Sequence, residues 1–315
     1  MKYERVIKMA KEILDILPKT IRDIVENAVN VDKLQEIRIK VNRPLYIYSN
    51  NKEKFFSYKT SLEEMKYILQ KISNYSIYAF EDEIKQGYIT IKGGHRVGLC
   101  GTVVTENNMV KTIKDIVSIN IRVAREIIDC SKEILPYMLD GNNVLNTIII
   151  SPPKCGKTTI LRDICRVLST GSSNLNFTGK NITIVDERSE LGACYKGVPQ
   201  MNVGDRTDVL DNCPKSQGII MAIRSMSPQI IICDEIGTSS DMESIIAALN
   251  SGVNLITTIH GFDVEDLYKR PVFKEIMENR VFKRAVVLSN KKGVGTIEYV
   301  YDFTKGEEIR GECKC

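Results

Sequence analysis

The sequence is poor in the residues that mark several common kinds of site. Its 315 residues include no tryptophan, only two histidines and no C-x-x-C pair, so a zinc site is not expected. No apolar run approaches the roughly 18 residues of a membrane-spanning helix. The N-terminus, Met1-Lys2-Tyr3-Glu4-Arg5, lacks the apolar core of a signal peptide. The nine cysteines are scattered and odd in number, which indicates reduced thiols and a cytoplasmic location.

The charge balance argues against one class of partner. The formal net charge is only +4, and no run of clustered Lys and Arg is interleaved with aromatic residues. Because proteins that bind DNA or RNA usually carry such a patch, no nucleic-acid partner is expected. The hydrophobic share of 43% and the charged share of 27% are ordinary for a globular protein. A chain of this length makes one large domain or two ordinary ones, and we favour two.

The first half has the pattern of a small α+β domain. Apolar spacing predicts two short helices within residues 1–30, broken at Pro18. Two alternating runs around Gly93-Gly94 predict a β-hairpin. The polar stretch of residues 140–143 is the expected boundary, so the N-terminal domain spans residues 1–140. The other expected elements are strands over 35–41, 44–48 and 116–123 and helices over 62–73, 75–83 and 131–139.

The second half alternates strands and helices, which is typical of a parallel sheet with crossover helices. This α/β domain is expected to span residues 141–305, followed by a disordered polar tail over 306–315. The expected strands are 144–150, 181–186, 229–233, 253–259, 284–289 and 295–301, and the expected helices are 160–168, 215–226, 239–250 and 263–278.

Residues 151–159 form the most informative motif. They are Ser151, Pro152, Pro153, Lys154, Cys155, Gly156, Lys157, Thr158 and Thr159. The motif lies between an apolar strand and a helix, which is the context of a phosphate-binding loop whose N–H groups converge on an anion. Lys157 would then reach the β- and γ-phosphates of ATP, and the Thr158 hydroxyl would bind Mg²⁺. A chance Gly-Lys-Thr sequence in an ordinary loop is the alternative.

A second motif supports the first. The buried-strand pattern over residues 229–233 ends in Asp234 and Glu235, at the sheet edge where ligands bind in open α/β folds. Asp234 can hold Mg²⁺ through water, and Glu235 can orient and deprotonate the attacking water. An acidic turn after a strand is the plain alternative. A nucleotide kinase has no use for a hydrolytic base, so Glu235 favours a hydrolase.

Other candidate residues lie after the strands predicted over 181–186 and 253–259 or flank the helix predicted over 215–226. Glu187 and Glu190 either support the attacking water or cap a helix. His260 either responds to the γ-phosphate by hydrogen bonding or packs in the fold. Arg206 and Arg224 are candidate arginine fingers, acting in their own subunit or a neighbouring one, and a surface ion pair is the alternative for each.

Several of these residues belong to longer runs that resemble the stage III sporulation protein AA family, a relative of the type II and type IV secretion ATPases. The resemblance covers nearly the whole chain, and its runs are residues 36–38, 42–45, 93–98, 186–190, 203–211, 221–228 and 258–261. By position, residues 151–158 match the family's Walker A loop, 230–235 its Walker B strand, 186–190 its acidic box and 258–260 its histidine box. Ser151 and Lys154 stand where this group usually has glycine. Lys154 adds a charge and, at positive φ, backbone strain, which bears on nucleotide affinity.

The resemblance implies a RecA-like P-loop ATPase core, with a mostly parallel sheet and flanking helices, behind a smaller α+β N-terminal domain. It implies ATP and Mg²⁺ as cofactors and a ring, expected to be a hexamer, of cytoplasmic motor subunits. This ring would associate peripherally with membrane proteins of a secretion-like channel from mother cell to forespore. Two alternatives are a RecA-like ATPase that binds nucleic acid and a scaffold that binds nucleotide without hydrolysing it. The intact Lys157, Asp234 and Glu235 argue against the scaffold.

Overall fold

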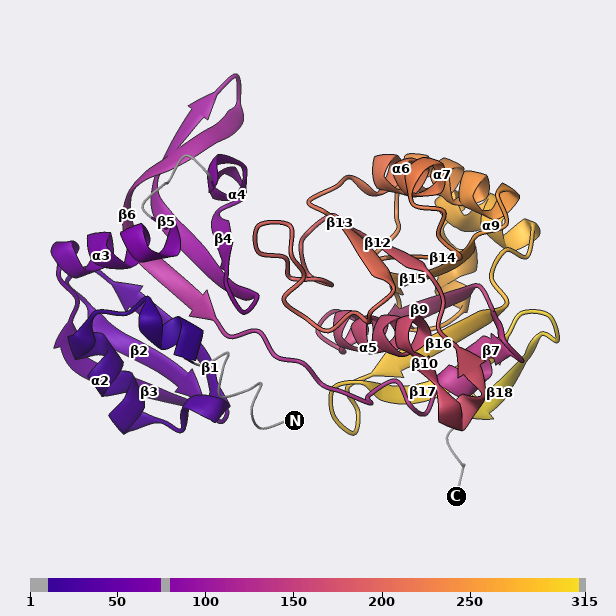
Figure 1. Ribbon diagram of the computed structural model, residues 1–315, viewed down its shortest axis with the longest axis horizontal. Coiled ribbons are helices and arrows are strands. Elements are labelled where there is room, and N and C mark those ends of the chain that lie inside the picture. The colour runs from indigo at the N-terminus through magenta and orange to yellow at the C-terminus, as the bar shows by residue number, and fades with distance from the viewer. Residues whose placement is uncertain (1–10, 75–79, 312–315) are drawn as a thin grey trace. The chain divides into compact units, whose positions relative to one another are not determined.

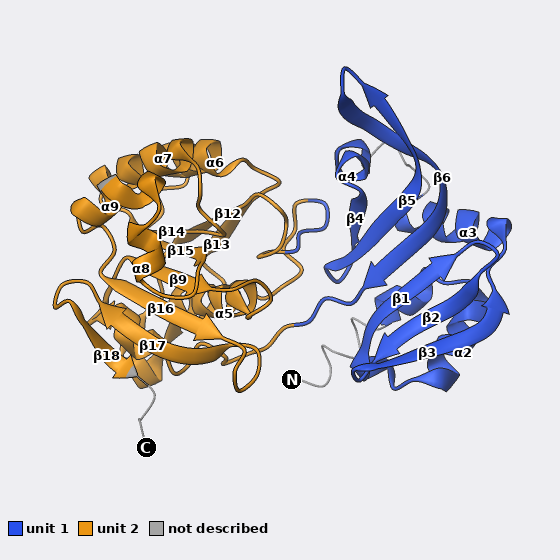
Figure 2. Cartoon of the chain, turned by 180° about the vertical axis from the view of Figure 1, so that it is seen from behind, with its two compact units in different colours: residues 1–125, 193–196 blue, residues 126–192, 197–315 orange. Residues whose placement is uncertain are grey.

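The computed structural model describes residues 11–74 and 80–311, which fold into two compact units (Figures 1 and 2). The units divide between Arg125 and Glu126, and the short segment Ala193–Lys196 groups with the first unit. The division lies before the boundary expected at residues 140–143. The physical reason is that Ile134 and Met138 are fully buried in the core of the second unit.

The first unit is built on a six-stranded antiparallel sheet in the order β3-β2-β1-β6-β5-β4. Alternate strand residues, among them Ile37, Ile39 and Ile47, are fully buried against helix residues such as Ile21 and Met65. The strands are β1 Leu34–Lys40, β2 Pro44–Ser49, β3 Lys52–Lys59, β4 Tyr88–Ile91, β5 His95–Glu106 and β6 Met109–Arg122, and the helices are α2 Lys19–Ala28, α3 Leu62–Ile72 and α4 Glu81–Lys85, with a 3-10 turn at Val31–Lys33.

Most elements expected in this unit are present. Helix α2 begins directly after Pro18, and the hairpin β4–β5 turns at Gly93 and Gly94, both at positive φ. The helix expected over 75–83 falls partly on residues outside the described ones, as does the start of the first helix. Strand β3 and the long extension of the β5–β6 hairpin were not predicted.

The second unit contains an eight-stranded sheet in the order β13-β12-β14-β15-β9-β16-β17-β18. The pairs from β13 to β16 are parallel, and β17 and β18 add antiparallel strands at one edge. The sheet strands are β9 Thr147–Ser151, β12 Ile182–Asp186, β13 Thr207–Asp211, β14 Ile230–Cys233, β15 Asn254–His260, β16 Arg284–Ser289, β17 Thr296–Asp302 and β18 Glu307–Gly311. This mostly parallel α/β architecture confirms the expected fold class.

Helices cover both faces of this sheet (Figure 1). On β9, Ile149 faces α5, whereas Ile148 and Ile150 belong to the cluster that includes residues of α6 and α7. Every residue of β9, β12 and β14 is buried, and most of these residues are apolar, as expected for parallel strands covered on both faces. The helices are α5 Lys157–Thr170, α6 Lys215–Ser225, α7 Ser239–Asn250, α8 Glu265–Tyr268 and α9 Lys274–Glu278; the remaining short elements are 3-10 turns at Leu135–Met138, Ser173–Leu175 and Pro271–Phe273 and the two-residue strands β7 Leu139–Asp140, β8 Asn143–Val144, β10 Gly171–Ser172 and β11 Phe177–Thr178.

Three expectations for residues that fold into the second unit were wrong in part. The helix expected over 263–278 is interrupted at Pro271, because proline has no N–H to continue the helix. The helix expected over 131–139 is reduced to a 3-10 turn that contains Pro136. The polar tail is not disordered throughout, because Glu307–Gly311 form β18 beside β17 and Ile309 packs on the core. Residues 312–315 lie outside the described chain.

Candidate active site

The sheet order places four chemically distinctive residues at one edge. Strands β12, β14, β15 and β9 are adjacent and parallel, so their carboxyl ends lie side by side. Asp186, His260 and Ser151 end three of these strands, and Asp234 directly follows the fourth. The carboxyl edge of an open parallel sheet is where ligands bind in such folds.

The loop between β9 and α5 has the geometry of a phosphate-binding turn. Gly156 precedes α5 with φ 88°, a left-handed conformation that favours glycine. A Cβ there would approach Val294 Cγ1 at 3.0 Å, and Gly295 N–H donates to the Cys155 carbonyl at 3.1 Å, so the β16–β17 loop supports this turn. Lys154 also has positive φ, at 63°, which is the condition under which backbone strain is expected at this position.

Lys157 contacts the ends of two strands, β9 and β15. It is only 8% exposed, and its Nζ donates to the Ser151 carbonyl at 3.2 Å and lies 2.6 Å from His260 Nδ1. His260 Nε2 lies 3.2 Å from Glu235 Oε2. Burial lowers the pKa of Lys157, and the carboxylates of Glu235 and Asp234 oppose that shift. An anion entering here meets a lysine with little competing water.

Asp234 and Thr158 supply the donors expected for a magnesium site. Both line the same cavity. Thr258 is fully buried, and its hydroxyl donates to Asp234 Oδ1 at 2.9 Å, which fixes the carboxylate while Oδ2 makes no described hydrogen bond. A hydroxyl and a carboxylate are oxygen ligands of the kind that Mg²⁺ prefers, so the residues present fit this ion.

These residues surround one open cavity of about 370 Å³. Its walls combine the phosphate loop with residues from the ends of β12, β14 and β15 and from the β16–β17 loop, namely Pro153, Lys154, Cys155, Gly156, Lys157, Thr158, Thr159, Arg188, Glu190, Asp234, Glu235, His260 and Val294. A larger cavity of about 1210 Å³ lies in the first unit beside α3 and β6. We assign the site to the smaller one because the phosphate loop and the convergent polar groups lie there.

The chain that follows β12 is held by a buried carboxylate. Asp186 accepts hydrogen bonds from the N–H groups of Glu190 at 2.8 Å, Leu191 at 2.9 Å and Gly192 at 2.8 Å. Burial raises the pKa of Asp186 to about 6, the negative charge of Asp211 adds to the rise, and the three backbone donors oppose it. Asp186 therefore shapes the loop and does not itself line the cavity.

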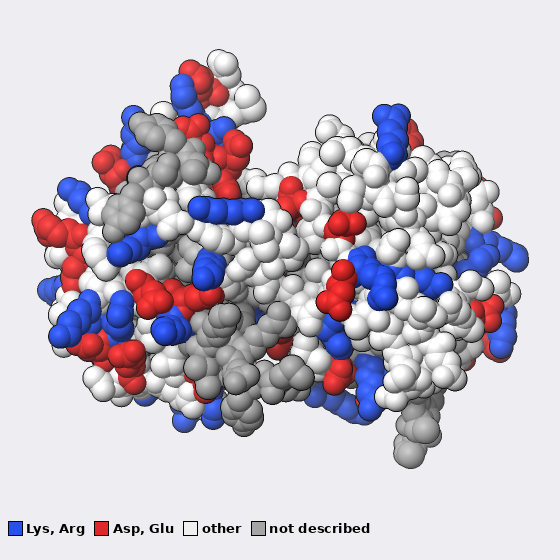
Figure 3. All heavy atoms as spheres, viewed as in Figure 1, with Lys and Arg blue, Asp and Glu red and all other residues white. Residues whose placement is uncertain are grey.

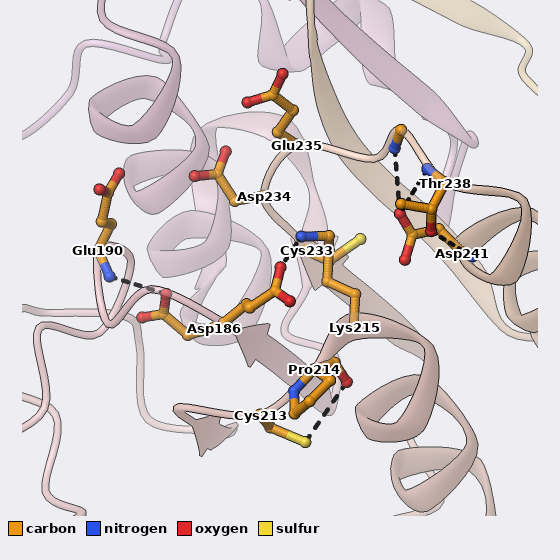
Figure 4. A network of polar contacts seen from close by, with 12 residues as sticks. Asp186, Glu190, Cys213, Pro214, Lys215, Cys233, Asp234, Glu235, Thr238 and Asp241 are labelled. Carbon is orange, nitrogen blue, oxygen red and sulfur yellow. Dashed lines mark hydrogen bonds and ion pairs between the residues drawn. The ribbon is translucent and has the colours of Figure 1, made fainter. Parts of the chain in front are cut away.

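The structure separates the two acidic candidates in that loop, Glu187 and Glu190. Figure 4 labels Glu190 together with Lys215, Asp234 and Glu235. Glu187 forms an ion pair with Lys215 at the start of α6. Glu190 lines the cavity together with Asp234 and Glu235. Only Glu190 is therefore brought to the phosphate-loop cavity, and any direct catalytic role of Glu187 stays a prediction.

Neither arginine candidate lines the cavity of its own chain. Arg206 donates to the carbonyls of Ser169 at 2.9 Å and Thr170 at 3.4 Å, at the far end of α5 from the phosphate loop. Arg224 is exposed on α6, in a groove with residues of α7. A role for either arginine across a subunit boundary stays a prediction.

Four residues with a place in this site were not singled out from the sequence. Arg188 and Val294 line the cavity, Thr258 holds Asp234, and Arg162 on α5 donates to carbonyls of the loop after β12. Arg188 stood inside the acidic run of residues 186–190, and Thr258 stood inside the run of residues 258–261. Arg162 and Val294 carry no motif, so only the tertiary structure reveals them.

Comparison with known proteins identifies relatives of this chain. The family profile described as "Sporulation stage III, protein AA" matches residues 7–309. Stage III sporulation protein AA of Bacillus subtilis (strain 168) is 45% identical over 293 residues, which cover 92% of this chain and 94% of that protein.

Solved structures share the fold at low sequence identity. The Legionella pneumophila ATPase DotB aligns with a TM-score of 0.59 and 13% identity, over 91% of this chain and 81% of that one. The pilus retraction motor PilT, solved with bound ADP, aligns with a TM-score of 0.59 and 14% identity, over 88% and 77%. These likenesses confirm the RecA-like ATPase fold that the sequence resemblance implied. Among the described residues, no helix is both long enough and apolar enough to cross a bilayer.

Proposed function

Because the chain belongs to the sporulation stage III protein AA family, we propose that it is a motor subunit that binds and hydrolyses Mg-ATP during endospore formation. In this proposal, hydrolysis in a ring of subunits moves membrane proteins of a secretion-like channel between mother cell and forespore. The observation that carries the proposal is the convergence of Lys157, Asp234, Glu235 and His260 on one cavity beside a phosphate-binding turn.

Binding follows from the geometry of the phosphate loop. The N-terminus of α5 and the loop N–H groups attract the phosphates, and Lys157 supplies a cation that is already desolvated. Mg²⁺, held by Thr158 and through water by Asp234, would neutralise charge on the β- and γ-phosphates. On binding, Lys157 exchanges its contact with His260 for a phosphate oxygen.

Hydrolysis is assigned to the carboxylates at the strand ends. Glu235 is the proposed base that orients and deprotonates the attacking water. His260 contacts both Lys157 and Glu235, so it can transmit occupancy of the phosphate site to the base. Glu190 is a second carboxylate on the cavity wall that can orient the water.

The assembly proposal rests on the resemblance and on the secretion ATPase fold. We propose that the chain forms a homo-oligomeric ring, namely a hexamer. This ring would lie in the cytoplasm and bind peripherally to membrane proteins. Arg224 is exposed on α6 and is therefore accessible to a neighbouring subunit. The alternative, an ATPase that acts on nucleic acid, finds little support on the face shown in Figure 3, where basic and acidic side chains of the first unit are interspersed.

The test is Mg-ATP hydrolysis by the purified chain, with its mass measured by light scattering with and without ATP. The proposal expects hydrolysis that depends on Mg²⁺ and a rate per subunit that rises with protein concentration as the ring assembles. Failure to bind ATP would contradict the proposal. Strong stimulation by single-stranded nucleic acid would favour the alternative.

A further inference from the structure

The loop after β12 presents an arginine to the phosphate cavity. Arg188 lies two residues beyond Asp186 and lines the same cavity as Lys157, Thr158 and Glu235. The neighbouring Ser189 has φ 51°, a left-handed turn, and Glu190 beyond it lines the cavity as well. One short segment thus supplies a cation and a carboxylate to the site.

This segment is held on both sides of its backbone. On one side, the carboxylate of the buried Asp186 accepts hydrogen bonds from the backbone N–H groups of Glu190, Leu191 and Gly192. Across from Asp186, Arg162 donates from Nη2 to the Glu190 carbonyl at 2.7 Å and from Nε to the Leu191 carbonyl at 2.8 Å. Both the donors and the acceptors of the same peptide groups are engaged.

The position of Arg162 ties the loop to the phosphate-binding turn. Arg162 stands four residues after Thr158 on α5, which is about one helical turn. The helix that carries Lys157 and Thr158 at its start therefore also carries the side chain that fixes residues 190 and 191. Pre-organised charge of this kind needs little rearrangement when negative charge develops on a substrate.

We propose that Arg188 is a catalytic residue that neutralises the transferred γ-phosphate within its own subunit, and that Arg162 is a positioning residue that holds the loop carrying it. The proposal rests on the proposed ATPase function and names a further residue of that site. In the reaction the water oxygen bonds to the γ-phosphorus and the bond to the β–γ bridging oxygen breaks. ADP leaves with that electron pair, and Glu235 receives the proton of the water.

The other arginines considered for this role are placed differently. The guanidinium of Arg206 packs over Gly179, where an added Cβ would clash with its Nη1, and it donates to carbonyls at the C-terminal end of α5. Arg224 lines the separate groove between α6 and α7. Arg188 is thus the arginine that the described structure brings to the phosphate cavity.

Kinetic measurements on Arg188→Ala and Arg188→Lys test the catalytic role of Arg188. Arg188→Ala should lower kcat by about 100-fold or more, since an arginine on the transferred phosphate contributes 10³- to 10⁵-fold in other NTPases. The Kd for a fluorescent ATP analogue should change by less than about fivefold, and Arg188→Lys should restore part of kcat. Arg280→Ala, an exposed arginine of the same unit outside the cavity, is the matched control. A kcat for Arg188→Ala within twofold of wild type would overturn the role.

Mixing experiments test whether Arg188 acts in its own subunit. Arg188→Ala subunits lack the cation and Lys157→Ala subunits lack nucleotide, so a mixture should show no activity beyond the sum of its parts. Recovered hydrolysis in the mixture would place Arg188 on a neighbour's nucleotide and overturn the assignment. If wild-type protein neither binds nor hydrolyses ATP, the proposed function fails together with this inference, whereas active wild type with active Arg188 variants refutes the inference alone.

A double-variant cycle tests the positioning role of Arg162. Arg162→Met removes both donors, and Arg162→Lys is the second variant if the first fails to fold. Each should lower kcat while the Kd for the ATP analogue stays within about fivefold. In the Arg188→Ala background the same change should have a much smaller effect on kcat, because the loop no longer carries the arginine. Fully additive losses in kcat would show that Arg162 acts independently of Arg188 and would overturn its positioning role.

Discussion

Asp186→Asn offers a quantitative test of how the loop after β12 is held. Asp186 is fully buried, and in the folded protein its pKa is raised by burial to about 6, against an ordinary value of 3.8. The difference of about 2.2 pH units corresponds to roughly 3 kcal/mol at about 1.4 kcal/mol per unit. Asparagine keeps the shape and one acceptor oxygen but does not titrate.

The sign of the effect follows from the direction of the shift. A carboxyl group with a raised pKa in the fold binds protons more tightly in the folded than in the unfolded chain. Its contribution to the free energy of unfolding is therefore fully present below pH 3.8 and is lost as the pH rises through about 6. The charged groups that face Asp186 are Asp211 on β13 and Arg162 on α5.

The assay is thermal unfolding of wild type and Asp186→Asn between pH 4.5 and pH 8. The stability of wild type relative to the variant should fall by about 2 kcal/mol over this range, which is on the order of 4–8 °C in Tm for a unit of this size. Other titrating groups are common to both proteins and cancel in the difference. A difference that stays flat, or that rises with pH, would refute the electrostatic description of Asp186.

Three further predictions concern the site and the core. Lys157→Ala should abolish binding of a fluorescent ATP analogue, because the phosphate loop loses its buried cation; near-native affinity would defeat the site assignment. Thr258→Val should weaken Mg²⁺-dependent analogue binding by roughly tenfold or more, since it removes the 2.9 Å hydrogen bond to Asp234, worth about 1.5–3 kcal/mol. Thr183→Val is its control, because the buried Thr183 hydroxyl on β12 has no hydrogen-bond partner within the described chain, and an equal loss in both variants would contradict the role of Thr258. Ile232→Ala, at a fully buried position of β14, should lower the free energy of unfolding by about 2–5 kcal/mol in urea titrations, and a loss under 1 kcal/mol would show that β14 is not a tightly packed central strand.

The sheet of the second unit was predictable because its chemistry is local. Buried parallel strands contain continuous apolar runs, such as residues 148–150 and 230–233. The helix of residues 239–250 begins with a capping box formed by Thr238 and Asp241. The candidate site residues could be predicted as well, because they stand at the ends of these apolar runs. Sheet order then brought Ser151, Asp234 and His260 together as expected.

The parts that could not be predicted depend on tertiary context. Strand β3 has only partly buried or exposed residues, so its sequence lacks a clear alternation of apolar and polar side chains. The choice between Glu187 and Glu190 depends on Lys215, whose ion pair with Glu187 crosses from α6. Arg188 could not be preferred over Arg206 because both lie in charged loops, and only the fold shows which loop reaches the phosphate cavity.

The most direct test of the central claim compares Glu235→Gln with wild type for Mg-ATP binding and phosphate release. Glu235 lines the phosphate cavity and lies 3.2 Å from His260, so the variant should bind ATP normally but hydrolyse it roughly 100-fold or more slowly, the usual contribution of a positioned base. Hydrolysis at the wild-type rate by the variant would contradict the assignment of Glu235 as the base.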